Sequence, residues 1–141
     1  MGDGWETARK LTRPKSLEVG PDGLVVSPGS DWAVLRLCGT GNVRKIEVDT
    51  AHFKGNFPES CLVEGAYIEG NMRYSNDESV EWKPLLPRTK LSADHQHYFE
   101  IGQGVIDCGN INFVRLSMFP DGGISRLRCW GELASESNSK L

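Results

Sequence analysis

The clearest pattern along the chain is an alternation of apolar and polar side chains with a period of two, as in a strand with one buried face. Residues 43–50 place Ile46 and Val48 between charged neighbours, and residues 112–119 alternate in the same way. Turn residues such as glycine and proline separate these runs. The expected strands are 32–38, 43–50, 60–68, 82–86, 97–101, 112–119 and 124–131.

Helical signals are confined to the start of the chain. Asp3 can cap a helix there, Glu6 three residues later completes a capping box, and Pro14 prevents continuation. About seven short strands and one helical turn predict an all-β fold, a β-sandwich of the jelly-roll kind. We expect one domain over residues 1–134, followed by a polar, disordered tail over residues 135–141.

The composition of the chain limits the classes of molecule that it is expected to bind. The chain has 141 residues and a net charge of −3, with lysine and arginine scattered among the acids. Nucleic acids and anionic membranes are bound by concentrated basic faces, so neither is expected as a partner. The four cysteines form no CxxC pair, which speaks against a structural zinc site and favours free thiols in a reducing compartment.

The first candidate site is the segment 49–60, which leaves a strand and enters a loop. It contains Asp49, His52, Asn56 and Glu59, a density of polar groups typical of loops that display functional side chains. The alternative is a plain turn, in which polar side chains satisfy backbone groups and phenylalanines plug the end of the sandwich.

A second candidate is the pair His95 and His97. In an extended strand both imidazoles lie on one face, a spacing used by metal and proton-transfer sites. A metal site would need a third ligand, such as His52 or Asp49. The alternative is a pair of edge histidines in solvent.

The third candidate is a set of arginines, Arg115, Arg126 and Arg128, on two strands that flank the Pro120–Gly123 turn. If these strands form a hairpin, the guanidinium groups can meet as a fork for a carboxylate. The alternative is a solvated strand face with salt bridges to acidic residues.

Four segments in order along the chain resemble the allantoicase family. GDGWETARKL (residues 2–11) resembles the family's DGWETxR element, and VDTAHFKGNFPES (48–60) resembles its strand-to-loop signature. HQHYFE (95–100) and VRLSMFPDGGISRLRCWG (114–131) resemble the elements near its end. No GxSxG, Walker A or HExxH motif competes with this interpretation.

The resemblance implies a galactose-binding-like jelly roll that hydrolyses allantoate to ureidoglycolate and urea. The family polypeptide carries two such repeats and forms oligomers, whereas this chain resembles a single repeat without its N-terminal portion. A homo-oligomer, or pairing with a second repeat, is therefore expected. The alternatives are a non-catalytic ligand-binding jelly roll and an inactive half-enzyme.

Allantoate hydrolysis breaks a bond between the central carbon and a ureido nitrogen, so the site needs no acyl nucleophile. It needs a carboxylate anchor, an acid for departing urea, a base, and partners for the ureido groups. No cofactor is required by the sequence, although a divalent metal at His95 and His97 stays open. The hypothesis assigns proton transfer to His52, Glu59 and His97. In this hypothesis, the substrate carboxylate is bound by Arg115, Arg126 or Arg128. The ureido groups are expected to form hydrogen bonds with Asp49 and Asn56.

The last three residues, Ser139, Lys140 and Leu141, form the tripeptide read as a peroxisomal address. The expected location is the peroxisomal matrix, with the cytoplasm as the alternative.

Overall fold

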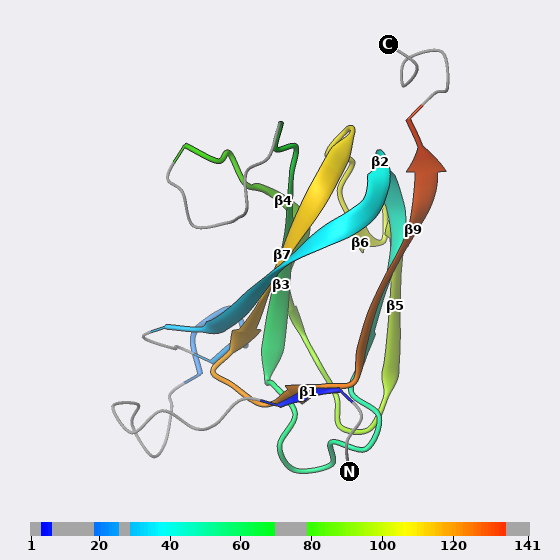
Figure 1. Cartoon of the computed structure of the whole chain (residues 1–141). Helices are drawn as coiled ribbons and strands as arrows, with labels where there is room; N and C mark the ends of the chain where they lie inside the picture. The colour runs from blue at the N-terminus through cyan, green and yellow to red at the C-terminus, as the bar shows by residue number, and fades with distance from the viewer. Residues whose placement is uncertain (1–3, 7–18, 26–28, 70–78, 135–141) are drawn as a thin grey trace.

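The computed structural model describes residues 4–6, 19–25, 29–69 and 79–134, and all regular structure in these ranges is β-strand (Figure 1). These ranges contain no helix suited to crossing a membrane. The strands are β1 (Trp5–Glu6), β2 (Asp31–Asp49), β3 (Ser60–Ala66), β4 (Lys83–Lys90), β5 (Gln96–Ile101), β6 (Gly104–Val105), β7 (Ile111–Phe119), β8 (Gly123–Ile124) and β9 (Arg126–Leu133).

The strands form two layers that share β2, as Figure 1 shows. The first half of β2 pairs with β7, which continues through β3 to β4; we call this the β7 layer. The second half of β2 pairs with both β5 and β9, and β6 joins β5; we call this the β5 layer. Irregular register between Arg36 and Gly41 marks the place where β2 leaves the β7 layer. The result is the predicted β-sandwich.

The core lies between the two layers. Ile46 and Val48 of β2 are fully buried and pack with Val63 of β3 and Leu116 of β7. The core positions of Ile46, Val48 and Leu116 agree with the prediction, but Glu47 between Ile46 and Val48 is also fully buried, so this part of β2 does not have one exposed face. Cys61 belongs to the same core, where burial raises the pKa of its thiol to about 12, so it acts as a small apolar side chain.

Two expectations about the elements are wrong. Trp5 and Glu6 do not form a helical turn, because their backbone pairs with Ile124 and Gly123 as the two-stranded ladder of β1 and β8. Segments 32–38 and 43–50 are not separate strands but parts of the 19-residue β2. Gly41, between the two parts, allows β9 to approach closely, since a side chain there would lie 2.3 Å from the Glu132 carbonyl oxygen.

The third correction concerns the arginine-bearing strands. β7 and β9 do not form a hairpin: β7 pairs with β2 and β3, whereas β9 pairs with β2 in the other layer. The Pro120–Gly123 turn carries the chain across the end of the sandwich instead of folding it back. Figure 1 shows β1 beside this crossing, at the end of the molecule where the loop between β2 and β3 also lies.

Contacts between these segments fix that end of the sandwich. The Gly123 amide donates to the Asn56 carbonyl at 2.7 Å, and the Ser125 amide donates to the Asp49 carbonyl at 2.7 Å. A side chain on Gly123 would overlap the ring of Phe53, at 2.1 Å from its Cε1 atom. The start of the chain, the loop after β2 and the turn after β7 therefore meet in one place.

Candidate functional site

A pocket of about 860 Å³ opens at this end of the sandwich. Its walls include Phe57, Leu91 and Pro120. Its polar side chains come from four separate parts of the chain: Glu6, Asn56, Glu59, Lys90 and Asp121. The three carboxylates offer acceptors for N–H groups of a small polar ligand, and the ammonium group of Lys90 offers one partner for an anionic group.

Glu59 is held at the pocket by its backbone. Its amide donates to the Phe119 carbonyl at 2.9 Å, and its carbonyl accepts from the Leu91 amide at 2.9 Å. The carboxylate lies 3.6 Å from the Arg88 guanidinium, measured from Oε1 to the terminal nitrogen. Oε1 is buried, and among the described residues it has no hydrogen-bond partner. Glu59 thus lines the pocket and carries a buried oxygen with unused acceptor capacity.

Asn56 and Glu6 join two of the segments that line the pocket. The Asn56 side-chain amide donates to the Glu6 carboxylate, across a separation of 50 residues along the chain. The Asn56 backbone carbonyl accepts from Gly123, which places the loop against the turn after β7. Both side chains are exposed and available to a ligand.

The loop that carries Asn56 and Glu59 begins with a tight turn. The Asp49 carboxylate accepts from the Ala51 amide at 2.8 Å, and the Phe53 amide donates to the Thr50 carbonyl at 2.9 Å. His52 takes a φ of 75° in this turn, and its amide donates to the Asp94 carboxylate at 2.8 Å. Asp49 is buried and supports the turn; neither Asp49 nor His52 lines the pocket.

His97 lies in β5 and is fully engaged. Its Nδ1 is 2.9 Å from the Val48 carbonyl, and its Nε2 accepts from the Ser92 amide at 2.8 Å. Burial lowers the pKa of this imidazole below its usual value, with a smaller contribution from nearby His95. The neutral ring with its proton on Nδ1 satisfies both bonds, so no ring nitrogen is left for a metal ion or a substrate.

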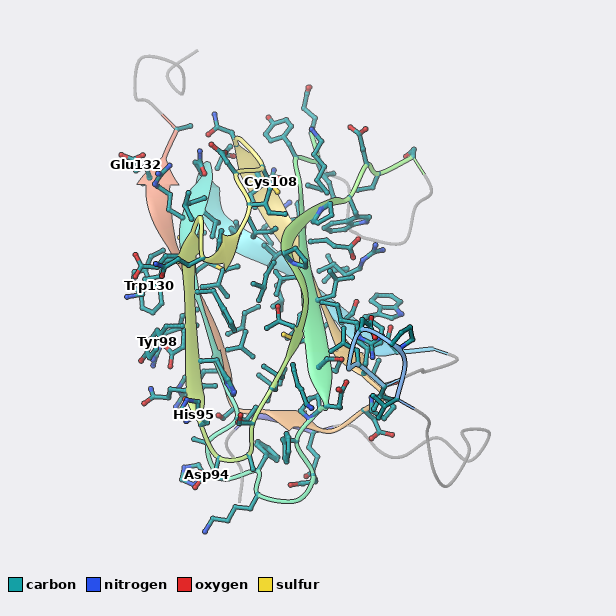
Figure 2. All side chains as sticks on the ribbon, turned by 180° about the vertical axis from the view of Figure 1, so that it is seen from behind. Asp94, His95, Tyr98, Cys108, Trp130 and Glu132 are labelled. Carbon is teal, nitrogen blue, oxygen red and sulfur yellow. The ribbon has the colours of Figure 1, made fainter. Side chains whose placement is uncertain are left out.

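The two histidine rings do lie together, with centroids 4.8 Å apart, and Figure 2 shows His95 beside Asp94 at one end of β5. In the described ranges, however, no three histidine, cysteine, aspartate or glutamate side chains form a set of metal ligands. The metal site considered from the sequence therefore lacks its third ligand in this part of the molecule.

Arg115 is held in an ion pair on the outer face of the β7 layer. It donates to Glu64 Oε1 from Nε at 2.9 Å and from a terminal nitrogen at 2.8 Å. Its guanidinium also lies 4.8 Å from the centroid of the Trp82 ring. Glu64 faces Arg115 directly across β3 and β7, so strand register creates this pair.

Arg128 is paired on the other layer. It donates at 2.9 Å to Glu47, which is fully buried and also accepts from Gln96 at 2.9 Å. Burial acts to raise the pKa of Glu47, but the hydrogen bonds from Gln96, Arg128 and Tyr98 outweigh it, so the pKa lies below its usual value. Figure 2 shows the neighbouring Tyr98 and Trp130 projecting from the outer side of this layer.

The three arginines thus do not converge on the pocket. Arg126 and Arg128 border a different hollow of about 370 Å³, and Arg115 lies on the outer face of the other layer. Of the eight residues assigned from the sequence, the structure brings Asn56 and Glu59 together at the pocket. His52, Asp49, His97 and the arginines lie outside its lining.

Three residues with polar side chains in the pocket were not assigned a role from the sequence: Glu6, Lys90 and Asp121. Glu6 and Asp121 are in the first and last of the segments that resemble the family, so the motifs contain a signal for them. Lys90 lies outside those segments, and only its pairing opposite Ser60 places it here.

Comparison with known proteins identifies the family. The family profile described as Allantoicase repeat matches residues 1–134. The "Probable allantoicase" of Ralstonia nicotianae is 44% identical over 134 residues, covering 94% of this chain and 35% of the relative. That of Photobacterium profundum is 45% identical over 136 residues, covering 93% of this chain and 35% of the relative. The chain thus spans about a third of the length of these relatives.

A solved structure has the same fold. The crystal structure of allantoicase from Saccharomyces cerevisiae is 34% identical, with a TM-score of 0.63, and covers 92% of this chain and 31% of its own. A second structure of allantoicase gives 32% identity and a TM-score of 0.64. The resemblance seen in the four motifs is confirmed, and the chain belongs to the allantoicase repeat family.

Proposed function

We propose that this chain provides an amidine-hydrolase site that converts allantoate and water into ureidoglycolate and urea. The observation that carries the proposal is the convergence of three family-like segments on one pocket, which contribute Glu6, Asn56, Glu59 and Asp121. These segments are far apart in the sequence. Their contribution to one pocket is a common reason why each of them resembles the family.

The pocket fits the chemical groups of allantoate. This substrate has one carboxylate and two planar ureido arms. Lys90 is the cation in the lining and takes the anchoring role that the sequence analysis gave to arginines. Carboxylates accept from ureido N–H groups, and the Asn56 side chain offers both a donor and an acceptor.

In the proposed reaction, the bond between the central carbon and one ureido nitrogen breaks, and its electron pair goes to that nitrogen. Water loses one proton as its oxygen bonds to the central carbon, the departing nitrogen gains one proton, and urea leaves, so that the protons balance. Glu59 is the proposed proton-transfer group, because its Oε1 is unpartnered among the described residues. The roles predicted for His52 and His97 stay sequence predictions, and the engaged ring of His97 favours Glu59 over it.

The test is urea release from the purified chain incubated with allantoate, compared with two variants and matched controls. Glu59→Gln is expected to lower kcat by about 10²-fold. Lys90→Met is expected to raise KM, because it removes an interaction with the substrate carboxylate. The controls are Glu69→Gln and Lys54→Met, which alter exposed residues outside the pocket lining. Folded variants at Glu59 and Lys90 with unchanged kinetics would contradict the assignment.

A folded but inactive repeat is the second candidate function, because the chain spans about a third of the length of its relatives.

We propose that the chain acts as a homo-oligomer or together with a second repeat. Light scattering of the purified chain, measured alongside urea release, tests this. A folded chain without urea release, at every oligomeric mass observed, would favour the inactive half-enzyme. Binding of allantoate without urea release would favour a ligand-binding module.

The peroxisomal location stays a separate proposal. It rests on Ser139, Lys140 and Leu141, which lie outside the described residues, and the bacterial origin of several relatives weighs against it. A reporter fused to the last ten residues of this chain tests it: import into peroxisomes supports the proposal, and a cytosolic reporter favours the cytoplasm.

A further inference from the structure

We propose that Arg88 is a positioning residue that keeps the Glu59 carboxylate oriented while leaving its acceptor capacity unused. The inference rests on the proposed function, since it assigns a second residue to the proton-transfer group of that pocket. Arg88 lies in β4, two residues before Lys90, and does not itself line the pocket.

The guanidinium of Arg88 is fixed by contacts on three sides. Its Nε donates to the Ser60 hydroxyl at 2.8 Å, and a terminal nitrogen donates to the Val25 carbonyl at 2.6 Å. Its central carbon lies 4.2 Å from the centroid of the Phe119 ring. A planar group held by two directional bonds and a stacking contact has little freedom to turn. The positive charge is therefore held at a fixed place.

That charge lies beside Glu59 but does not bond to it. The separation of 3.6 Å between the Arg88 terminal nitrogen and Glu59 Oε1 allows strong electrostatic attraction and is too long for a good hydrogen bond. Both side chains are largely shielded, with exposed fractions of 26% for Arg88 and 19% for Glu59, so solvent screens the attraction only in part.

The ion pair of Arg115 and Glu64 shows what a purely structural arrangement looks like in the same layer. There the arginine donates twice to one carboxylate oxygen, at 2.9 and 2.8 Å, and also lies over an aromatic ring. Arg88 directs its N–H groups to Ser60 and Val25 instead. The difference leaves Glu59 Oε1 without a donor among the described residues, as a group that exchanges protons with substrate requires.

The experiment compares Arg88→Ala and Arg88→Lys with the matched control Arg115→Ala, using urea release from the purified chain. Arg88→Ala is expected to lower kcat by about tenfold to a hundredfold with little change in KM, and Arg88→Lys to restore part of the loss. Arg115→Ala is expected to keep kcat. Millimolar guanidinium, far below denaturing concentrations, is expected to restore activity to Arg88→Ala by occupying the vacated place.

The double variant Glu59→Gln with Arg88→Ala separates positioning from general structural support. If Arg88 acts through Glu59, its removal adds no further loss of kcat once the carboxylate is gone, and guanidinium restores nothing. Additive losses, or equal losses in the folded Arg88 and Arg115 variants, would overturn the role of Arg88 alone. Absence of urea release from the unaltered chain would instead overturn the proposed function, and the role of Arg88 with it.

Discussion

The side-chain amide of Asn56 donates a hydrogen bond to the carboxylate of Glu6, and this bond joins the start of the chain to the loop after β2. The two residues come from two different family-like segments and lie in the same pocket wall. The contact therefore adds a side-chain link between two segments that the β1–β8 ladder and the Gly123–Asn56 backbone bond already bring together.

The first prediction is that this hydrogen bond can be rebuilt with its donor and acceptor exchanged. Asn56→Asp places two carboxylates together and is expected to lower the free energy of unfolding by about 1 kcal/mol. Adding Glu6→Gln restores a donor opposite an acceptor, with the roles exchanged, and is expected to recover most of the loss. Urea unfolding of the two single variants and the double variant measures the coupling. Additive effects would show that the bond has no energetic role.

The second prediction concerns Gly123, whose Cα faces the buried ring of Phe53. Gly123→Ala is expected to destabilise the fold by about 3 kcal/mol, because the new methyl group overlaps that ring. Gly55→Ala is the matched control: a side chain there meets nothing within 4 Å, and a change within about 0.5 kcal/mol is expected. Thermal unfolding measures both. Phe53→Leu in the Gly123→Ala background is expected to recover part of the stability.

The third prediction is a pH dependence that originates at His97. Its pKa is lowered in the fold, so below about pH 6.5 the unfolded chain binds a proton at this residue that the folded chain does not. Stability is expected to be highest above that pH and to fall as the pH decreases toward the lowered pKa. Unfolding titrations between pH 8 and pH 5 measure the slope. His97→Gln is expected to flatten it, whereas His95→Gln, which removes only the smaller electrostatic contribution to the lowered pKa of His97, is expected to reduce the slope less.

The fourth prediction applies at more acidic pH. The lowered pKa of Glu47 means that this carboxylate contributes stability above its usual pKa near 4.5, and that the contribution is lost as the pH falls through the lower folded value. Arg128 and Gln96 then lose their acceptor. Glu47→Gln is expected to weaken the pH dependence below pH 4.5, at the cost of lower stability at neutral pH. An unchanged acid transition would contradict this.

The fifth prediction follows from the backbone of His52, whose φ of 75° lies in the left-handed region. Asparagine tolerates this conformation better than a branched side chain does. His52→Asn is therefore expected to retain or slightly raise the melting temperature, and His52→Val to destabilise by about 1 kcal/mol. The same two substitutions at His95, whose φ is not in the left-handed region, are expected to show no such difference in stability between asparagine and valine.

The strands could be predicted from the sequence where the local alternation of apolar and polar residues alone determines which side chains face the core. Ile46 and Val48 face the core because successive side chains of a strand point to opposite faces, whatever its partners are. The helical turn at Glu6 was wrong for the opposite reason: a capping pattern is local, whereas pairing with Gly123 is a contact across the whole chain. Gly39 and Gly41 resembled a turn, yet they lie within β2, where Gly41 allows β9 to approach closely.

The site was predictable only in part, because its geometry depends on partners that are distant in the sequence. Asn56 and Glu59 were found since they cluster in one loop. Arg115 was assigned to the substrate, but its carboxylate partner is Glu64, which strand register brings opposite it. Lys90 carries no local signal, and its place in the pocket follows from the pairing of β4 with β3.

The assembly of the pocket from residues 6, 55–57, 59, 90–91 and 120–122 has a consequence for synthesis on the ribosome. A nascent chain that has emerged only as far as β5 already contains Glu59 and Lys90, but it lacks the turn at Asp121 and the partner strand of β1. Ligand recognition therefore has to wait until nearly all of the repeat has left the exit tunnel. A truncation before residue 120 removes Pro120, Asp121 and Gly122 from the lining, however much of the sandwich it leaves.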